Sequence, residues 1–189
     1  VDWQAEVFVN GTLVGEHKGG YDPFSFDITD LLAKGKKHNL TVKVLDQTDK
    51  WYQPRGKQIM DPHGIWYTPV SGIWQTVYLE FVKNDYIKSF KVYPNIENAT
   101  LTITADLVGK GDFKATAFWD GKEVGVAESK VLGQTVTVTL NLTEKHLWEV
   151  GKGGLYSLTL NFSDDEVTSY FGLREVDLSD GVCKINGKP

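Results

Sequence analysis

The stretch that decides the fold lies near the middle of the chain, where residues 64–80 have the sequence GIWYTPVSGIWQTVYLE. Its second half alternates. Ile73, Val77 and Leu79 fall on one face of an extended chain, interrupted only by Gln75, and the residues between them fall on the other face. This period of two predicts a half-buried β-strand.

The first half of the stretch differs, because it cannot be regular strand throughout. Pro69 lacks the backbone N–H that a strand ladder needs, and Gly72 marks a bend or a bulge. We therefore expect an aromatic loop that runs directly into a buried strand.

The preceding part of the chain carries further strand signals. Four short alternating segments predict strands at residues 5–9, 12–17, 24–28 and 40–44. Between the first two, Asn10-Gly11 predicts a type I′ hairpin turn, which requires positive φ at both positions. Thr29 is expected to cap one short helical turn.

The order of these motifs resembles glycoside hydrolase family 2, the family of β-galactosidases, β-glucuronidases and β-mannosidases. The motifs that carry the resemblance are VNG at 9–11, VG at 14–15, GGY at 19–21, PFSFDIT at 23–29 and SGIWQTVYLE at 71–80. The match spans residues 3–82 with few gaps. It implies a sugar-binding jelly roll at residues 1–82, truncated at its N-terminus, with further strands of the sandwich expected before residue 1.

A long connection without a strand pattern occupies residues 46–69, and loops of this length are usually functional or mobile. It concentrates aromatic and planar hydrogen-bonding side chains, which suit sugars. The candidate substrate-binding residues are Trp51, Arg55, Asp61, His63, Trp66 and Tyr67. The alternative is that its aromatic residues close the end of the sandwich and its charges are solvated. For Trp74, within the predicted strand, this structural role is favoured over sugar binding.

The family resemblance implies that this loop lies at the rim of the active site in the whole enzyme. Several family members carry an Asp shortly before the Gly-Ile-aromatic motif, and the matching position here is Trp66. Asp61 lies further upstream and could substitute only if the loop differs in length. Galactoside, glucuronide and mannoside specificity therefore stay open.

The second half of the chain predicts another all-β domain at residues 83–177, after a short polar boundary at 82–85. Strand patterns occur at residues 86–93, 99–107, 113–119, 123–127, 135–142, 155–162 and 167–176. Seven short strands separated by turns, including Asp120-Gly121, are typical of an immunoglobulin-like sandwich. The predicted fold class is all-β, with two antiparallel β-sandwiches: a partial jelly roll followed by an immunoglobulin-like sandwich. Residues 178–189 resemble the start of a linker or hairpin into a catalytic barrel.

Catalytic residues are not expected within these 189 residues. The resemblance implies a retaining glycosidase with two carboxyl groups about 5 Å apart on a (β/α)₈ barrel of about 250 residues, downstream of Pro189. The densest acidic cluster, residues 164–166, fits a solvated turn better than a catalytic pair. The four His residues are scattered, so neither a metal site nor a cofactor is predicted.

Charge and composition limit the classes of partner that the chain is expected to bind. The net charge of −5 is spread over interspersed acidic and basic residues, which predicts neither a nucleic-acid partner nor a membrane partner. The single Cys183 excludes an intrachain disulfide and leaves the compartment open, with a periplasmic or secreted location slightly favoured. The expected partners are a carbohydrate substrate in the full enzyme, the enzyme's own catalytic barrel, and further copies of the chain through unpaired strand edges.

These observations predict the non-catalytic N-terminal region of a family 2 glycoside hydrolase, inactive by itself, that scaffolds and rims the active site of the barrel. One alternative is a stand-alone carbohydrate-binding module, and another is a structural or adhesive pair of sandwiches. The terminal sequence Ile185 to Pro189, which resembles the entry into another domain, argues against the first alternative. The aromatic 46–69 loop argues against the second.

Overall fold

The computed structural model describes all residues 1–189 and contains twelve β-strands, two short 3₁₀ turns and no α-helix. The predicted all-β, antiparallel class is therefore confirmed. The chain divides into two compact units, Val1–Leu79 and Glu80–Pro189, each described by itself below. None of its helical segments has the length and apolar character needed to cross a membrane.

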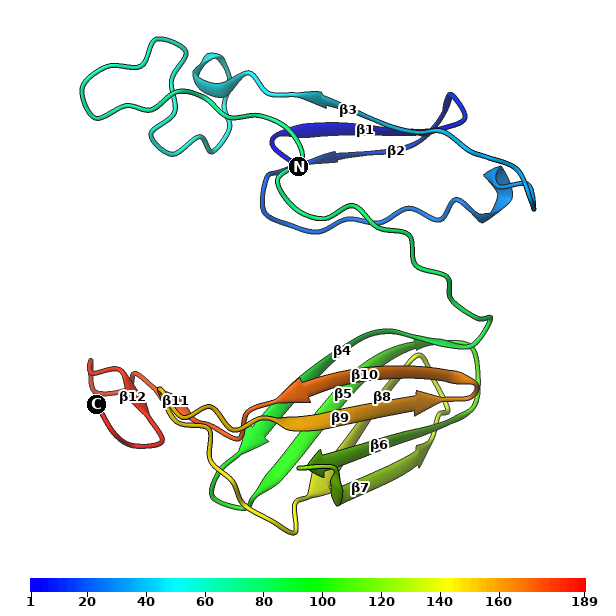
Figure 1. Cartoon of the computed structure of the whole chain (residues 1–189), viewed down its shortest axis with the longest axis vertical. Helices are drawn as coiled ribbons and strands as arrows, with labels where there is room; N and C mark the ends of the chain where they lie inside the picture. Colours follow the sequence, from blue (N-terminus) through cyan, green and yellow to red (C-terminus); the bar gives the residue numbers. More distant parts are fainter. The chain divides into compact units, whose positions relative to one another are not determined.

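A three-stranded antiparallel sheet forms the centre of the first unit, in the order β2-β1-β3 (Figure 1). Its strands are β1 (Gln4–Val9), β2 (Thr12–Lys18) and β3 (Leu40–Leu45). The predicted inward face of β1 is confirmed, because Ala5, Val7 and Val9 are all buried.

The hairpin between β1 and β2 has the predicted turn. Asn10 has φ of 52° and Gly11 has φ of 82°, as a type I′ turn requires. The Asn10 side chain also connects distant segments, since its Nδ2 donates to the carbonyl of Leu31 at 3.2 Å and its Oδ1 accepts from Asn39 N at 3.1 Å. The turn therefore positions the connection that leads into β3.

The strand predicted at residues 24–28 is wrong, although the alternation behind it is correct. Phe24, Phe26 and Ile28 are half-buried and their neighbours are exposed. The segment does not extend the sheet but covers its face: a Cβ on Gly15 of β2 would lie 2.2 Å from the Phe26 ring. Both sides of β1 are already paired, and the half-buried rings of Phe24 and Phe26 pack over β2, on His17 and Gly15, instead of extending the ladder.

The expected cap of the following helical turn, η1 (Thr29–Leu31), is also wrong. Thr29 does not cap it with its own side chain. The carboxylate of Asp27 accepts from Thr29 N at 2.9 Å and from Thr29 Oγ1 at 2.6 Å. An Asp two residues ahead of a free N–H competes well for this position.

The strand predicted from Ile73 onwards is the largest correction. Ladder pairing near it stops at Gly72, whose N–H and carbonyl exchange hydrogen bonds with Asp2 at 3.0 and 2.9 Å. Beyond that point no segment of the chain pairs with residues 73–82, and the side chains of Ile73 and Phe81 are 49% and 87% exposed. An alternating pattern specifies which face is apolar, but a strand forms only where a partner offers hydrogen bonds.

The second unit is a two-sheet sandwich (Figure 1). One sheet has the order β4-β5-β8, with strands β4 (Tyr86–Asn95), β5 (Thr100–Val108) and β8 (Thr135–Asn141). The other has the order β10-β9-β6-β7, with strands β6 (Asp112–Trp119), β7 (Lys122–Lys130), β9 (Tyr156–Phe162) and β10 (Asp165–Phe171). In antibody constant domains the four-stranded sheet contains the first strand, whereas here the fourth strand, β7, pairs with β6 and leaves the first in the sheet of three.

The core of this unit lies between the two sheets and consists of the alternate residues that the sequence predicts. Leu101, Ile103 and Leu140 from one sheet and Leu158 and Leu160 from the other are at most 1% exposed. A short hairpin follows the sandwich, formed by β11 (Val176–Asp177) and β12 (Lys184–Ile185).

Tyr156 is the largest fully buried side chain of that core, and its hydroxyl is satisfied. The hydroxyl donates to the carbonyl of Glu144 at 2.8 Å and accepts from His146 N at 2.7 Å. The ring stacks on Phe171 with a centroid distance of 4.8 Å. Burial raises the pKa of Tyr156, so the hydroxyl remains a donor at neutral pH.

Candidate functional site: the 46–69 loop

The 46–69 loop is closed at its base by one carboxylate. Asp46, the first residue after β3, accepts hydrogen bonds from Thr48 N at 2.8 Å, Gln53 Nε2 at 2.6 Å and Ser71 Oγ at 2.5 Å. Thr48 begins the 3₁₀ turn η2 (Thr48–Lys50) and is buried. The start and the end of the loop are therefore held together by Asp46.

These hydrogen bonds also affect the ionisation of Asp46. Burial raises the pKa of Asp46, but the hydrogen bonds from Ser71, Thr48 and Gln53 outweigh it and leave the pKa below its ordinary value. Asp2 lies close enough to be affected: burial, followed by the negative charge of Asp46, raises the pKa of Asp2. One carboxylate is thus held ionised beside another that binds a proton more readily.

The far part of the loop has a small ladder of its own. Tyr67 N donates to the Lys57 carbonyl at 2.8 Å, and Ile59 N donates to the Tyr67 carbonyl at 3.1 Å. Ile59 is buried, and the Gln58 side chain accepts from Val70 N at 2.5 Å. The loop is therefore an ordered surface structure with internal hydrogen bonds.

Arg55 and Trp66, two of the predicted site residues, lie together. The Arg55 guanidinium carbon is 5.4 Å from the centre of the Trp66 ring, within the range of a cation–π contact. Arg55 Nη1 also donates to the Gln58 carbonyl at 2.9 Å. Both side chains are half-buried, so the Trp66 ring already has an occupant on one face.

Trp51 and Tyr67 present open ring faces. Their side chains are 62% and 66% exposed, and neighbouring Tyr52 is almost fully exposed, with its ring centre 6.4 Å from that of Trp51. Flat exposed aromatic faces can stack against the apolar face of a sugar ring. Trp51 and Tyr67 are therefore the stacking candidates that the structure favours within the predicted set.

Asp61 and His63 are exposed, near the tip of the loop. His63 Nδ1 lies 2.8 Å from the backbone carbonyl of Asp61, and the Trp66 N–H donates to the His63 carbonyl at 2.9 Å. These bonds order the turn, and they leave the Asp61 carboxylate facing solvent. No cluster of three or more His, Cys, Asp or Glu side chains in the chain is arranged to hold a metal ion.

Trp74 does not lie in the predicted strand, but its contacts are structural. Its side chain is 54% exposed, and the indole Nε1 donates to the carbonyl of buried Gly20 at 2.8 Å. Its ring meets that of Tyr21 edge-on at 6.4 Å. Trp74 therefore fastens the 19–21 segment to residues just past the loop.

Asp46 and Ser71, which close the loop, are not among the site residues predicted from the sequence. Only one local signal pointed to them: an Asp two residues before Thr48 is a known turn-forming pattern. The partnership with Ser71 joins residues 25 positions apart, which no local pattern reports.

Comparison with known proteins relates the sequence of this chain to a family. The sequence profile described as "Glycosyl hydrolases family 2, sugar binding domain" matches residues 1–82. A β-galactosidase of Thermoanaerobacter pseudethanolicus is 30% identical over 202 residues, which cover 98% of this chain and 26% of that protein. A β-glucuronidase of Streptococcus agalactiae is 25% identical over 209 residues, which cover 100% of this chain and 34% of that protein.

Solved structures share the fold. A β-glucuronidase from Ruminococcus gnavus in complex with an N1-substituted uronic isofagomine superposes with a TM-score of 0.79 at 20% identity, covering 99% of this chain and 34% of that one. A putative β-galactosidase from Bacteroides fragilis gives a TM-score of 0.73 at 24% identity over 98% of this chain. The chain thus spans about a quarter to a third of the length of these relatives. Residues 1–82 are a sugar-binding domain of glycoside hydrolase family 2, in an all-β chain that contains no catalytic barrel.

Proposed function

We propose that this chain is the non-catalytic N-terminal region of a family 2 glycosidase that hydrolyses O-glycosidic bonds. The observation that carries the proposal is the family match over residues 1–82 within relatives that are three to four times longer. In this proposal residues 1–82 are the sugar-binding jelly roll, 83–177 the immunoglobulin-like sandwich and 178–189 the connection toward a catalytic barrel. In this proposal the catalytic barrel of the same enzyme is the partner of these domains.

We propose further that the 46–69 loop lines the rim of the active site formed with that barrel. The loop is ordered by Asp46 and by its internal ladder, and it presents Trp51 and Tyr67 with open faces. An ordered loop loses little conformational entropy when a sugar binds, which is what a rim contact requires. Arg55 supports the loop by covering Trp66.

An activity assay tests the non-catalytic role. The purified 189-residue chain is incubated with the nitrophenyl β-galactoside, β-glucuronide and β-mannoside, and release of nitrophenol is followed. We expect no release above that of the buffer, because the two barrel carboxyl groups are absent. Turnover of order 1–10³ s⁻¹ on any of the three would refute the proposal.

A stand-alone carbohydrate-binding module is the second candidate, favoured by the same exposed aromatic residues. It predicts that the isolated chain binds sugar through Trp51 and Tyr67 with no barrel present. Titration of the ¹⁵N-labelled chain with galactose, glucuronate and mannose separates the two candidates. Saturable shifts in residues 46–69 would favour the module, and their absence together with a kinetic role in the longer enzyme would favour the rim.

A further inference from the structure

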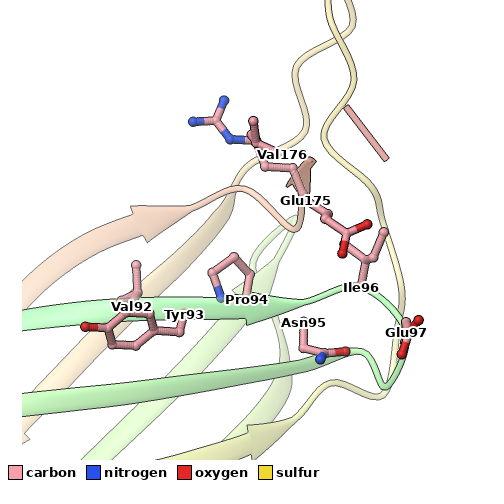
Figure 2. A pocket seen from close by; sticks show the side chains of 9 residues that line it. Val92, Tyr93, Pro94, Asn95, Ile96, Glu97, Glu175 and Val176 are labelled. Carbon is pink, nitrogen blue, oxygen red and sulfur yellow. The ribbon is translucent and has the colours of Figure 1, made fainter. Parts of the chain in front are cut away.

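A groove lies in the second unit, on a surface that the proposed function does not use. It has a volume of about 390 Å³ and separates the end of β4 from the segment that follows β10 (Figure 2). Residues 92–97 form one wall and residues 174–176 form the other. The volume falls within the range of about 300–1,000 Å³ that is usual for small-ligand sites.

The lining combines an apolar surface with polar groups of both kinds. Pro94 and Val176 supply the open apolar part, because Val92 and Ile96 pack against the core of the sandwich, and Tyr93 adds an aromatic ring that is 54% exposed. Glu97, Glu175, Asn95 and Arg174 supply carboxylate, amide and guanidinium groups. Figure 2 shows the side chains of Glu97 and Glu175 on opposite walls.

The two carboxylates are not consumed by contacts within the chain, whereas the Arg174 guanidinium already stacks on the Trp148 ring. None of the chain's ion pairs includes Glu97, Glu175 or Arg174. Asn95 uses only its Oδ1, which accepts from Asn98 N at 2.9 Å. The two carboxylates and the amide N–H₂ group of Asn95 are therefore free to meet a ligand.

The wall formed by residues 174–176 is held in place from behind. Asn186 clamps the backbone of Glu175, since its Oδ1 accepts from Glu175 N at 2.9 Å and its own N–H donates to the Glu175 carbonyl at 3.0 Å. Asn186 Nδ2 also donates to the Trp148 carbonyl at 2.8 Å, and the Arg174 guanidinium carbon lies 4.6 Å from the Trp148 ring centre. The wall is thus preorganised, and binding would order few additional groups.

We propose that this groove binds a neutral mono- or disaccharide. A sugar hydroxyl both donates and accepts hydrogen bonds, so it satisfies carboxylates and an amide N–H₂ group in one site, while the ring's C–H face packs on the exposed ring of Tyr93. The two carboxylates outnumber the single Arg174 guanidinium in the lining, so the net negative charge of the groove repels a phosphate or a uronate. The site is separate from the 46–69 loop and stands whether or not the loop is a rim.

NMR titration of the ¹⁵N-labelled chain with lactose, cellobiose and mannobiose tests the proposal, with trilysine as a fourth probe. We expect saturable shifts confined to residues 92–97 and 174–176, with a Kd of about 1–10 mM, as suits an open groove. Glu175→Gln and Tyr93→Ala should each weaken binding at least about fivefold. Tyr170→Ala, which removes an exposed tyrosine from β10, is the matched control and should leave the Kd unchanged.

Three results would overturn the assignment. One is the absence of saturation by all three disaccharides at about ten times the expected Kd. Another is saturable binding that neither Glu175→Gln nor Tyr93→Ala weakens. The third is saturation by trilysine alone, which would assign the two carboxylates to a basic peptide instead. Because Glu175→Gln leaves the Asn186 clamp on the backbone untouched, it keeps the test valid even if Tyr93→Ala misfolds.

Discussion

Ser71 Oγ donates a hydrogen bond of 2.5 Å to a carboxylate oxygen of Asp46, and this bond closes the 46–69 loop. The other carboxylate oxygen of Asp46 holds Thr48 and Gln53 inside the loop. The aromatic residues of the loop are therefore presented by a fixed frame, and the frame depends on one ionised carboxylate.

Ser71→Ala should destabilise the first unit by about 1–2 kcal/mol, because a hydrogen bond to a charged group is lost. The measurement is urea unfolding followed through the amide signals of residues 1–79. Ser25→Ala is the matched control, since Ser25 is exposed and its hydroxyl makes no hydrogen bond in the chain. Equal stability of the two variants would show that the Asp46–Ser71 bond does not hold the loop.

Lowering the pH should reduce the stability that ionised Asp46 contributes to the loop. The pKa of folded Asp46 lies below the ordinary 3.8, so its stabilising contribution is present above that pH and is lost as the pH falls through the folded pKa. Asp2 has the opposite shift, so its contribution to stability grows as the pH falls through its raised pKa. Thermal unfolding between about pH 2 and pH 5 should therefore show a shallower acid loss in Asp46→Asn. Asp2→Asn should remove the gain in stability that Asp2 contributes at low pH. If Asp46→Asn lost stability at low pH as steeply as the unmodified chain does, this account would be contradicted.

Trp51→Ala and Tyr67→Ala should lower kcat/KM of the longer enzyme if the 46–69 loop is a rim. Loss of one stacking contact corresponds to about 1–3 kcal/mol, or roughly a 5- to 150-fold fall. The melting temperature should hardly change, because both rings are mostly exposed. Leu132→Ala, at a fully exposed position of the second unit, is the control for surface truncation. Normal kinetics in both loop variants would mean that the loop does not touch the substrate.

Tyr156→Phe should cost the second unit about 1–2 kcal/mol, because His146 N and the Glu144 carbonyl both lose their partner. Tyr170→Phe removes a hydroxyl from an exposed ring and should be nearly neutral. Denaturant unfolding of the second unit compares the two directly. A neutral Tyr156→Phe would indicate that water replaces the hydroxyl.

Phe81→Ala tests the correction made to residues 73–82. Phe81 is 87% exposed, so truncation should change the unfolding free energy by less than about 0.5 kcal/mol. Phe113→Ala, at a fully buried position of β6, should cost about 3–5 kcal/mol. A comparable loss in Phe81→Ala would mean that the segment is buried in solution, in a pairing that the structure does not contain.

The sequence predicted the site only in part. It identified the 46–69 loop and its aromatic residues, because composition and the absence of periodicity are visible along the chain. From the sequence alone Trp51 and Trp66 are equivalent candidates. In the structure Trp51 is mostly exposed, whereas Arg55 covers one face of the Trp66 ring. Which face of a ring is free depends on a neighbour that the loop's path brings to it.

Alternation and turn chemistry determined most of the fold by themselves. Asn10-Gly11 and Asp120-Gly121 adopt the positive φ values that their hairpins need. All seven strands of the second unit's sandwich occur where the pattern predicts them, although the last one ends at Phe171 instead of Val176. These features depend on adjacent residues, or on strands whose partners lie within the same unit. Tertiary structure alone decided that residues 24–28 cover a sheet, that residues 73–82 remain unpaired and that Asp46 binds Ser71. The reason is physical: periodicity specifies the apolar face of a segment, whereas a hydrogen-bonded ladder or a buried carboxylate also needs a partner brought from elsewhere in the chain.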